Sequence, residues 1–147
     1  MKQSFTLRQA NLGDLDAMMA IGHEGLRPHI EAFKTWDDAV EEAGFREHFV
    51  PEQIEIIQVG GADAGYIKIE HRGDHHYIDG IYIAKTYRGT GIGTAVLNAK
   101  LSELSDLPVR LRVYKTNPAQ HLYTRLGFGF VSTADEAVIM QYPPSTT

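Results

Sequence analysis

The chain has 147 residues, a formal net charge of −5 at neutral pH, and no cysteine. The missing cysteine excludes disulfides, thiolate metal sites and a cysteine nucleophile. The sequence has neither the basic patch typical of nucleic-acid binding nor an apolar run long enough to span a membrane. The first residues do not resemble a signal peptide, so we expect a cytoplasmic protein. The length suits a single domain over residues 1–142, followed by a disordered tail over residues 143–147.

The first third of the chain predicts a strand followed by helices. Phe5–Arg8 alternates between apolar and polar residues, which is typical of a short strand. Asn11–Asp14 is a turn with capping side chains, and helical spacing of apolar residues follows it. We expect Pro28 to break this helix, because proline lacks the backbone N–H that a helix interior needs. A second helix is expected to open at Trp36 and to end at Pro51.

The rest of the chain predicts strands and two helices. Alternation and turn residues predict strands over residues 54–59, 64–71 and 76–84, with tight turns between them. Further on, the pattern predicts a helix over 93–104, a strand over 108–114, a helix over 117–126, and closing strands over 128–131 and 137–140. This order of elements favours one mixed α/β domain.

A turn rich in glycine, Tyr87-Arg88-Gly89-Thr90-Gly91-Ile92-Gly93-Thr94, joins a predicted strand to a predicted helix. A helix N-terminus has unpaired amides and a partial positive charge, and glycines let the backbone approach a ligand closely. The segment therefore predicts a cradle for a phosphate or pyrophosphate. It has neither the Gly-Lys-Ser/Thr of a Walker loop nor the G-x-G-x-x-G spacing of a dinucleotide site. A tight turn without a ligand is the alternative interpretation.

The pattern Arg/Gln-x-x-Gly-x-Gly/Ala at the start of a helix resembles the signature of the GNAT (general-control-type) N-acetyltransferases, with Arg88, Gly91 and Gly93 in the matching places. Lys85 departs from the family, in which many members have proline at that position. The resemblance implies a central, mostly antiparallel twisted sheet of six to seven strands flanked by about four helices. It also implies acetyl-CoA as the acyl donor and no metal.

By this resemblance, the strand before the turn pairs its backbone with the pantetheine arm, and the amides of the turn hold the CoA pyrophosphate. The cofactor-binding residues implied in this half are Ile81, Tyr82, Ile83, Arg88, Gly89, Thr90, Gly91, Ile92, Gly93 and Thr94.

A second match to the family covers Asn117 to Phe128, which resembles an Asn-x-x-Ala variant followed by Leu-Tyr-x-x-x-Gly-Phe. The resemblance implies that Asn117, Ala119 and Tyr123 contact the cofactor and that Tyr123 protonates the departing thiolate. Helix punctuation alone explains a cap at Asn117 and a stop at Gly127. A tyrosine that only packs beside the core is the alternative for Tyr123.

Amine acetylation also needs a proton acceptor, because an ammonium group has no lone pair. In the resembling family the N–H at the position of Ile83 polarises the thioester carbonyl, and strand carboxylates near the cofactor motif act as bases in some members. Asp79 is the catalytic candidate here, and Glu70 on the neighbouring strand is a substrate-site candidate. Asp79 paired with a strand neighbour or with solvent is the alternative.

Three histidines, His71, His75 and His76, cluster with Asp74 around a predicted hairpin turn. Adjacent residues in a strand point to opposite faces, and a hairpin turn is exposed to solvent. The cluster is therefore more typical of a solvated turn than of a metal site, and we expect no metal.

The segment over residues 22–51, called the acceptor segment below, shapes the acceptor site in the resembling family. It holds seven acidic and three basic residues, and Phe33 and Trp36 are candidates for an aromatic wall that faces a cation. We expect a primary amine of a small molecule or an amino acid as the acceptor. An ordinary amphipathic helix with a charged outer face is the alternative reading of the segment.

Other functions remain open at this stage. A protein or peptide amine as acceptor, a longer acyl-CoA, and a non-catalytic acyl-CoA-binding sensor all fit the motifs. Open sheet edges are compatible with a homodimer.

Overall fold

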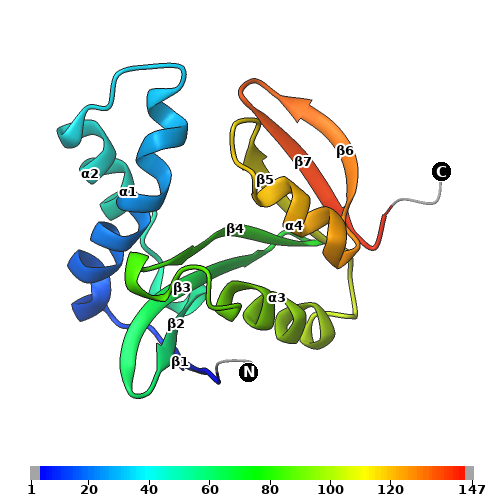
Figure 1. Cartoon of the computed structure of the whole chain (residues 1–147), viewed down its shortest axis with the longest axis horizontal. Helices are drawn as coiled ribbons and strands as arrows, with labels where there is room; N and C mark the ends of the chain where they lie inside the picture. The colour runs from blue at the N-terminus through cyan, green and yellow to red at the C-terminus, as the bar shows by residue number, and fades with distance from the viewer. Residues whose placement is uncertain (1–3, 145–147) are drawn as a thin grey trace. The chain divides into compact units, whose positions relative to one another are not determined.

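The computed structural model describes residues 4–144 and contains four α-helices and seven strands (Figure 1). The helices are α1 (Leu15–Glu31), α2 (Asp38–Glu47), α3 (Ile92–Glu103) and α4 (Ala119–Leu126). The strands are β1 (Thr6–Gln9), β2 (Ile54–Val59), β3 (Ala62–His71), β4 (His76–Ile83), β5 (Val109–Tyr114), β6 (Gly129–Ala134) and β7 (Ala137–Tyr142). Residues 145–147 of the predicted tail lie outside the described residues. No described helix is long and apolar enough to cross a membrane.

The strands form a seven-stranded sheet in the order β1-β2-β3-β4-β5-β7-β6. The pairs β1–β2, β2–β3, β5–β7 and β6–β7 are antiparallel, whereas β4 and β5 are parallel. A parallel pair needs a long crossover connection, and α3 supplies it between these two strands. The expected mixed α/β fold, with a mostly antiparallel sheet and four helices, is confirmed.

The chain divides into two compact units. Unit 1 comprises residues 1–68 and 81–93, and unit 2 comprises residues 69–80 and 94–147. Both β3 and β4 contribute residues to each unit, because the division falls within these strands. The single domain over residues 1–142 stays a prediction.

In unit 1, β1 and β2 pair, and α1 lies beside α2 (Figure 1). A cluster of buried apolar side chains forms its core: Ala10, Met18, Phe49, Ile54, Ile56 and Tyr66. The short helix η1 (Leu12–Asp14) leads into α1, and the Asn11 and Asp14 side chains cap it reciprocally. Arg8 donates two hydrogen bonds to Asp14, of 2.8 and 3.0 Å, and lowers the pKa of that carboxyl. The predicted capping turn is thereby tied to β1.

The expectation that Pro28 breaks the first helix is wrong, because α1 continues to Glu31 with Pro28 inside it. The proline lies in the last turn, so the missing N–H removes one hydrogen bond, to Glu24, close to the helix end. Ile30, beyond the proline, is buried, and this packing favours the added turn.

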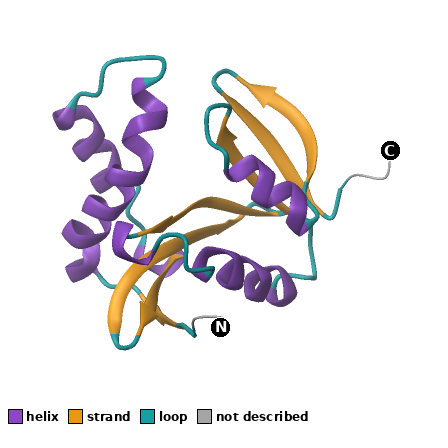
Figure 2. Cartoon of the chain, viewed as in Figure 1, coloured by secondary structure: helices purple, strands orange, loops and turns teal. Residues whose placement is uncertain are grey.

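Unit 2 contains most of α3, together with α4, β5 and the hairpin of β6 and β7. Figure 2 draws these strands in orange and the helices in purple. Helical periodicity predicts an apolar stripe of Ile92, Val96, Leu97, Leu101 and Leu104; the first four are buried, Ile92 in unit 1 and the others in unit 2, and Leu104 is half-buried just beyond α3. The alternate residues Val109, Leu111 and Val113 of β5 are buried as well, as the alternation in the sequence predicts.

Candidate active site

The loop over residues 88–93, called the glycine loop below, belongs to unit 1 and follows β4 through the short helix η3 (Lys85–Tyr87). Gly89 and Gly91 have φ angles of 75° and 85°, in the left-handed region that only glycine adopts at low cost. The Thr90 hydroxyl donates to the carbonyl of Tyr87 at 2.6 Å and bends the chain back. Ile92, the first residue of α3, is 1% exposed and fixes the end of the loop.

The amides of the glycine loop take no part in the backbone hydrogen bonds of the turns and loops among the described residues. Within the described residues, the N–H groups of residues 89–93 donate to no backbone carbonyl outside the helix, whereas those of Tyr87 and Arg88 bond to Ala84 and Lys85. The first four N–H groups of an α-helix have no partner within the helix. The loop therefore places N–H donors at the positive end of α3, with Gly89, Thr90 and Gly91 exposed, an arrangement that suits anionic oxygens.

The Arg88 side chain is held by the protein. Its Nε donates to the Ile83 carbonyl at 2.9 Å, and its Nη2 donates to Glu24 of α1 at 3.1 Å. Arg88 therefore ties the glycine loop to the end of β4 and to α1. Sequence reasoning missed the role of Glu24, which counted only as one acid of the acceptor segment. A sequence pattern does not reveal a contact between residues 64 positions apart.

The end of β4 has its own support in unit 1. The Tyr82 ring packs on the Tyr66 ring, with centroids 5.5 Å apart. A side chain at Gly25 of α1 would lie 3.0 Å from Tyr82 Cδ1, so the helix passes close to this ring. The predicted cofactor residues from Ile81 to Gly93 thus lie in unit 1, where Tyr82 and Arg88 contact α1, whereas Thr94 belongs to unit 2.

In unit 2, α4 presents Tyr123. Its ring is partly exposed and lies 5.7 Å from the Phe128 ring. Burial around the hydroxyl raises the pKa of Tyr123 to about 12. The phenol therefore keeps its proton at neutral pH, so it can donate a proton but cannot act as a base there.

Asn117 holds the start of α4 in unit 2. Its Oδ1 accepts the Ala119 amide at 2.9 Å, which satisfies one N–H at the helix N-terminus. Gly127 ends the helix with a φ of 107°, as predicted. Local capping therefore places Asn117, Ala119 and Tyr123 on one short helix and its lead-in.

The two candidate carboxylates also belong to unit 2. Asp79 on β4 is exposed, and its charge adds to burial in raising the pKa of Tyr77. Glu70 on β3 is half-buried and pairs with Arg72 at 3.3 Å, and Arg72 in turn stacks over Tyr77 with 3.7 Å to the ring centroid. Glu70 is thus held in an ion pair with a neighbouring guanidinium.

The two aromatic candidates of the acceptor segment differ in burial. Phe33 is 40% exposed, whereas Trp36 is 8% exposed. The Trp36 ring packs edge-on against His23, with centroids 5.1 Å apart, and its Nε1 donates to Asp38 at 2.8 Å. Trp36 therefore fastens the connection between α1 and α2, and Phe33 is the more accessible of the pair.

The prediction that the histidine cluster forms a solvated turn is wrong for His76, which is 4% exposed. Its Nε2 bonds to Asp106 at 2.9 Å and its Nδ1 contacts Nδ1 of His71. The chain between α3 and β5 brings Asp106 to this histidine, which local alternation could not reveal. Within residues 4–144, no group of three or more His, Asp or Glu side chains is placed to hold a metal ion.

The sequence and the fold of the chain are similar to those of known proteins. A family model described as an acetyltransferase (GNAT) domain matches residues 20–138. No curated protein matches the sequence significantly.

Among solved structures, the chain is similar to the PaiA N-acetyltransferase of Thermoplasma acidophilum in complex with coenzyme A, with a TM-score of 0.74, 18% identity, and 94% of this chain and 98% of that chain covered. It is similar to the ribosomal-protein-S18-alanine N-acetyltransferase of Escherichia coli, with a TM-score of 0.70, 23% identity, and coverage of 98% and 96%. A third similar structure is the histone acetyltransferase HPA2 and related acetyltransferase of Corynebacterium glutamicum, with a TM-score of 0.72, 22% identity, and coverage of 98% and 98%.

Proposed function

The chain belongs to the GNAT acetyltransferase family, and on that premise we propose that it transfers the acetyl group of acetyl-CoA to a primary amine of a small molecule or amino acid. The transfer is direct, within a complex that holds both substrates, and uses no covalent enzyme intermediate. The observation that carries the proposal is the glycine loop, with its unpaired amides at the N-terminus of α3 and its left-handed glycines.

The glycine loop fits the CoA pyrophosphate. Two linked phosphates need several donors at short spacing, and consecutive amides of a loop that enters a helix supply them. Because Arg88 is engaged by Ile83 and Glu24, its guanidinium serves mainly to hold the loop in shape. Recognition of the phosphates then falls to the backbone, whose left-handed φ angles at Gly89 and Gly91 require glycine.

Acetyl-CoA supplies the acetyl group as a thioester. The Ile83 N–H, at the end of β4, is the proposed donor to the carbonyl oxygen, where negative charge develops during attack. As the amine nitrogen bonds to the carbonyl carbon and the C–S bond breaks, the sulfur takes a proton from the Tyr123 hydroxyl. The pKa of about 12 keeps that proton in place until transfer.

The amine must give up a proton, and Asp79 is the proposed acceptor, directly or through water. Glu70 is the weaker candidate, because its carboxylate is already engaged in an ion pair with Arg72 at 3.3 Å. Asp79 is exposed to solvent on β4.

The acceptor segment is the proposed binding site of the amine. Its excess of acidic over basic residues favours a cation and disfavours an anion. Exposed carboxylates on α1 and α2 supply the negative charge of this part of unit 1, although Glu24, Glu31 and Glu42 are each paired with an arginine. Phe33 is the accessible aromatic side chain of the segment.

The proposal is tested by following free-thiol release from acetyl-CoA with a panel of small amines, amino acids and short peptides. For Tyr123→Phe we expect kcat to fall about 100-fold, the usual size of a general-acid contribution. Acetyl-CoA affinity, measured by calorimetry, should stay unchanged, which separates the loss of the acid from misfolding. Thiol release that depends on no amine, or an unchanged kcat in the variant, would overturn the assignment. Release with peptides alone would replace the small-molecule acceptor by a peptide amine.

A further inference from the structure

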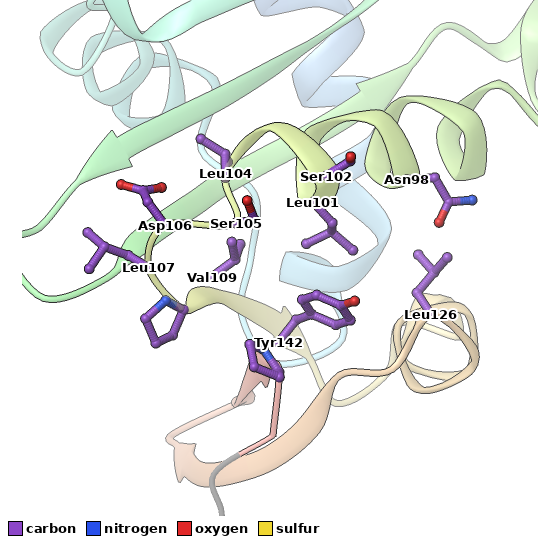
Figure 3. A pocket seen from close by; sticks show the side chains of 12 residues that line it. Asn98, Leu101, Ser102, Leu104, Ser105, Asp106, Leu107, Val109, Leu126 and Tyr142 are labelled. Carbon is purple, nitrogen blue, oxygen red and sulfur yellow. The ribbon is translucent and has the colours of Figure 1, made fainter.

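Unit 2 contains a pocket of about 680 Å³, shown in Figure 3 and called the second pocket below. The end of α3, the chain that leads into β5, the last residue of α4 and the end of β7 line it. Its lining residues are Asn98, Leu101, Ser102, Leu104, Ser105, Asp106, Leu107, Pro108, Val109, Leu126, Tyr142 and Pro143. None of these is among the residues predicted for the cofactor or the acceptor. The volume lies within the range of small-molecule sites in proteins, about 300–1,000 Å³.

The second pocket has an apolar floor and a polar rim. Leu101 and Val109 are buried at its base, and Leu126 closes it from α4. Asn98 and Ser102 are exposed and lie four residues apart on the face of α3 that borders the pocket. A small molecule that is apolar along its body and polar at its end matches this lining.

One wall of the second pocket is an aromatic ring held in place. Tyr142 packs against Phe128 at 5.7 Å between centroids. A side chain at Gly127 would approach the Tyr142 ring to 2.9 Å, so the glycine that ends α4 also makes room for this ring. The neighbouring Gln141 accepts a hydrogen bond from Arg110 at 2.8 Å and donates one to the Pro143 carbonyl at 3.1 Å. The wall is therefore built by contacts within unit 2.

Within the described part of the chain, the only formal charge in the lining of the second pocket is negative. Asp106 is the single formally charged residue in the lining, which includes no Lys, Arg or His among the described residues. The buried His76 holds this carboxylate through Nε2, and His71 contacts His76 from its other nitrogen. The hydrogen bond from His76 lowers the pKa of Asp106, so the carboxylate stays ionised at neutral pH. A carboxylate has about four lone-pair sites; the bond to His76 uses one of them, and the backbone N–H groups of Asp106 and Leu107 also act on this carboxylate.

The single charged side chain of the described lining lies at one end of the second pocket (Figure 3). Figure 3 shows Asp106 and Leu107 at one end of the pocket and Leu126 and Asn98 at the other, with Val109 and Tyr142 between them. A ligand that lies along the pocket would meet the carboxylate at one end only.

We propose that the second pocket binds a small organic cation, with an ammonium group at Asp106 and an apolar body over Leu101, Val109 and the Tyr142 ring. The site is separate from the proposed acetyl transfer and does not depend on it. Its recognition combines one ion pair with apolar burial, so a neutral analogue binds less tightly and an anionic analogue binds least.

The test is a titration of the 15N-labelled protein with phenethylamine, without acetyl-CoA, followed by NMR. We expect saturable shifts of the amides of residues 98–109, 126 and 142. 3-Phenylpropionate, of similar size and opposite charge, should bind at least about fivefold more weakly. Asp106→Asn should weaken phenethylamine binding about threefold, the size of an exposed ion pair.

A pair of variants on α3 locates the site. Ser102→Trp places an indole in the pocket and should abolish the shifts. Ala99→Trp places the same side chain on an exposed position of the same helix outside the lining and should leave them unchanged. Equal binding of the anion, equal binding in Ser102→Trp, or no saturable shift at these residues would each overturn the proposal. Shifts confined to residues 22–51 would place the amine at the acceptor segment and equally exclude the second pocket.

Discussion

The glycine loop and the acceptor segment, both in unit 1, differ in what holds their conformation. The loop depends on its backbone: its glycines have left-handed angles, its amides are unpaired, and its side chains are mostly exposed. The acceptor segment depends on side chains, because Trp36 is fastened by His23 and Asp38. The contrast teaches that a sequence motif can be recognised where the backbone itself forms the site, as in the glycine loop. Where side-chain packing holds a segment in place, as in the acceptor segment, the sequence shows no such motif.

The largest expected effect concerns the acceptor segment. Trp36→Ala should lower the free energy of unfolding by about 3 kcal/mol, because it removes a large buried ring and leaves a cavity. Phe33→Ala, at the more exposed ring, should change it by about 0.5 kcal/mol. Denaturant unfolding of both variants measures the difference. An unchanged stability in Trp36→Ala, together with a raised KM for the amine, would instead make Trp36 part of the acceptor wall.

The next effect tests the backbone of the glycine loop. Gly91→Val forces a β-branched residue to a φ of 85° and should lower CoA affinity at least about tenfold, since left-handed backbone costs such residues about 2 kcal/mol. The matched control is Gly44→Ala, a helical glycine in α2 where an added Cβ meets nothing within 4 Å. The control should raise stability by about 0.5–1 kcal/mol and leave CoA affinity unchanged. Full CoA affinity in Gly91→Val would remove the loop from phosphate binding.

The smallest effect tests the link between the two regions. Glu24→Gln removes the charge that holds Arg88 and should weaken CoA binding about threefold at low salt, with a smaller loss at high salt. Glu31→Gln breaks a comparable exposed pair, with Arg27 at 3.2 Å on the same helix, and should leave CoA binding unchanged. Calorimetric titration with CoA measures both. An equal response of the two variants would show that Glu24 acts through general charge and not through Arg88.

Much of the fold was predictable because it depends on local patterns. Alternation in β5, the apolar stripe on α3 and the glycine that ends α4 are signals within a few neighbours, and the structure agrees with each. The helix α4 itself begins at Ala119, two residues after the predicted start. The error at Pro28 has a specific cause: the rule for helix interiors does not hold in a last turn whose next residues are buried. His76 was misjudged because its partner Asp106 lies 30 positions away.

The residues of the candidate site likewise fall into those that local sequence patterns identify and those that they do not. Arg88, Gly91, Gly93 and the segment around Tyr123 were identified from sequence, and their proposed roles await the experiments above. Glu24, the anchoring of Arg88 and the second pocket were not predictable, since each joins segments that are distant in the chain. The pKa of Tyr123 likewise depends on burial, which periodicity does not report.

The sequence by itself determined the order of elements, the family, and the loop whose glycines shape its backbone, because these depend on residue type and on neighbours along the chain. Only the tertiary structure decided which side chains became partners: Arg88 with Glu24, Trp36 with His23, and His76 with Asp106. The physical reason is that hydrogen bonds and packing act over a few ångströms in space, and folding alone sets which distant residues come within that range.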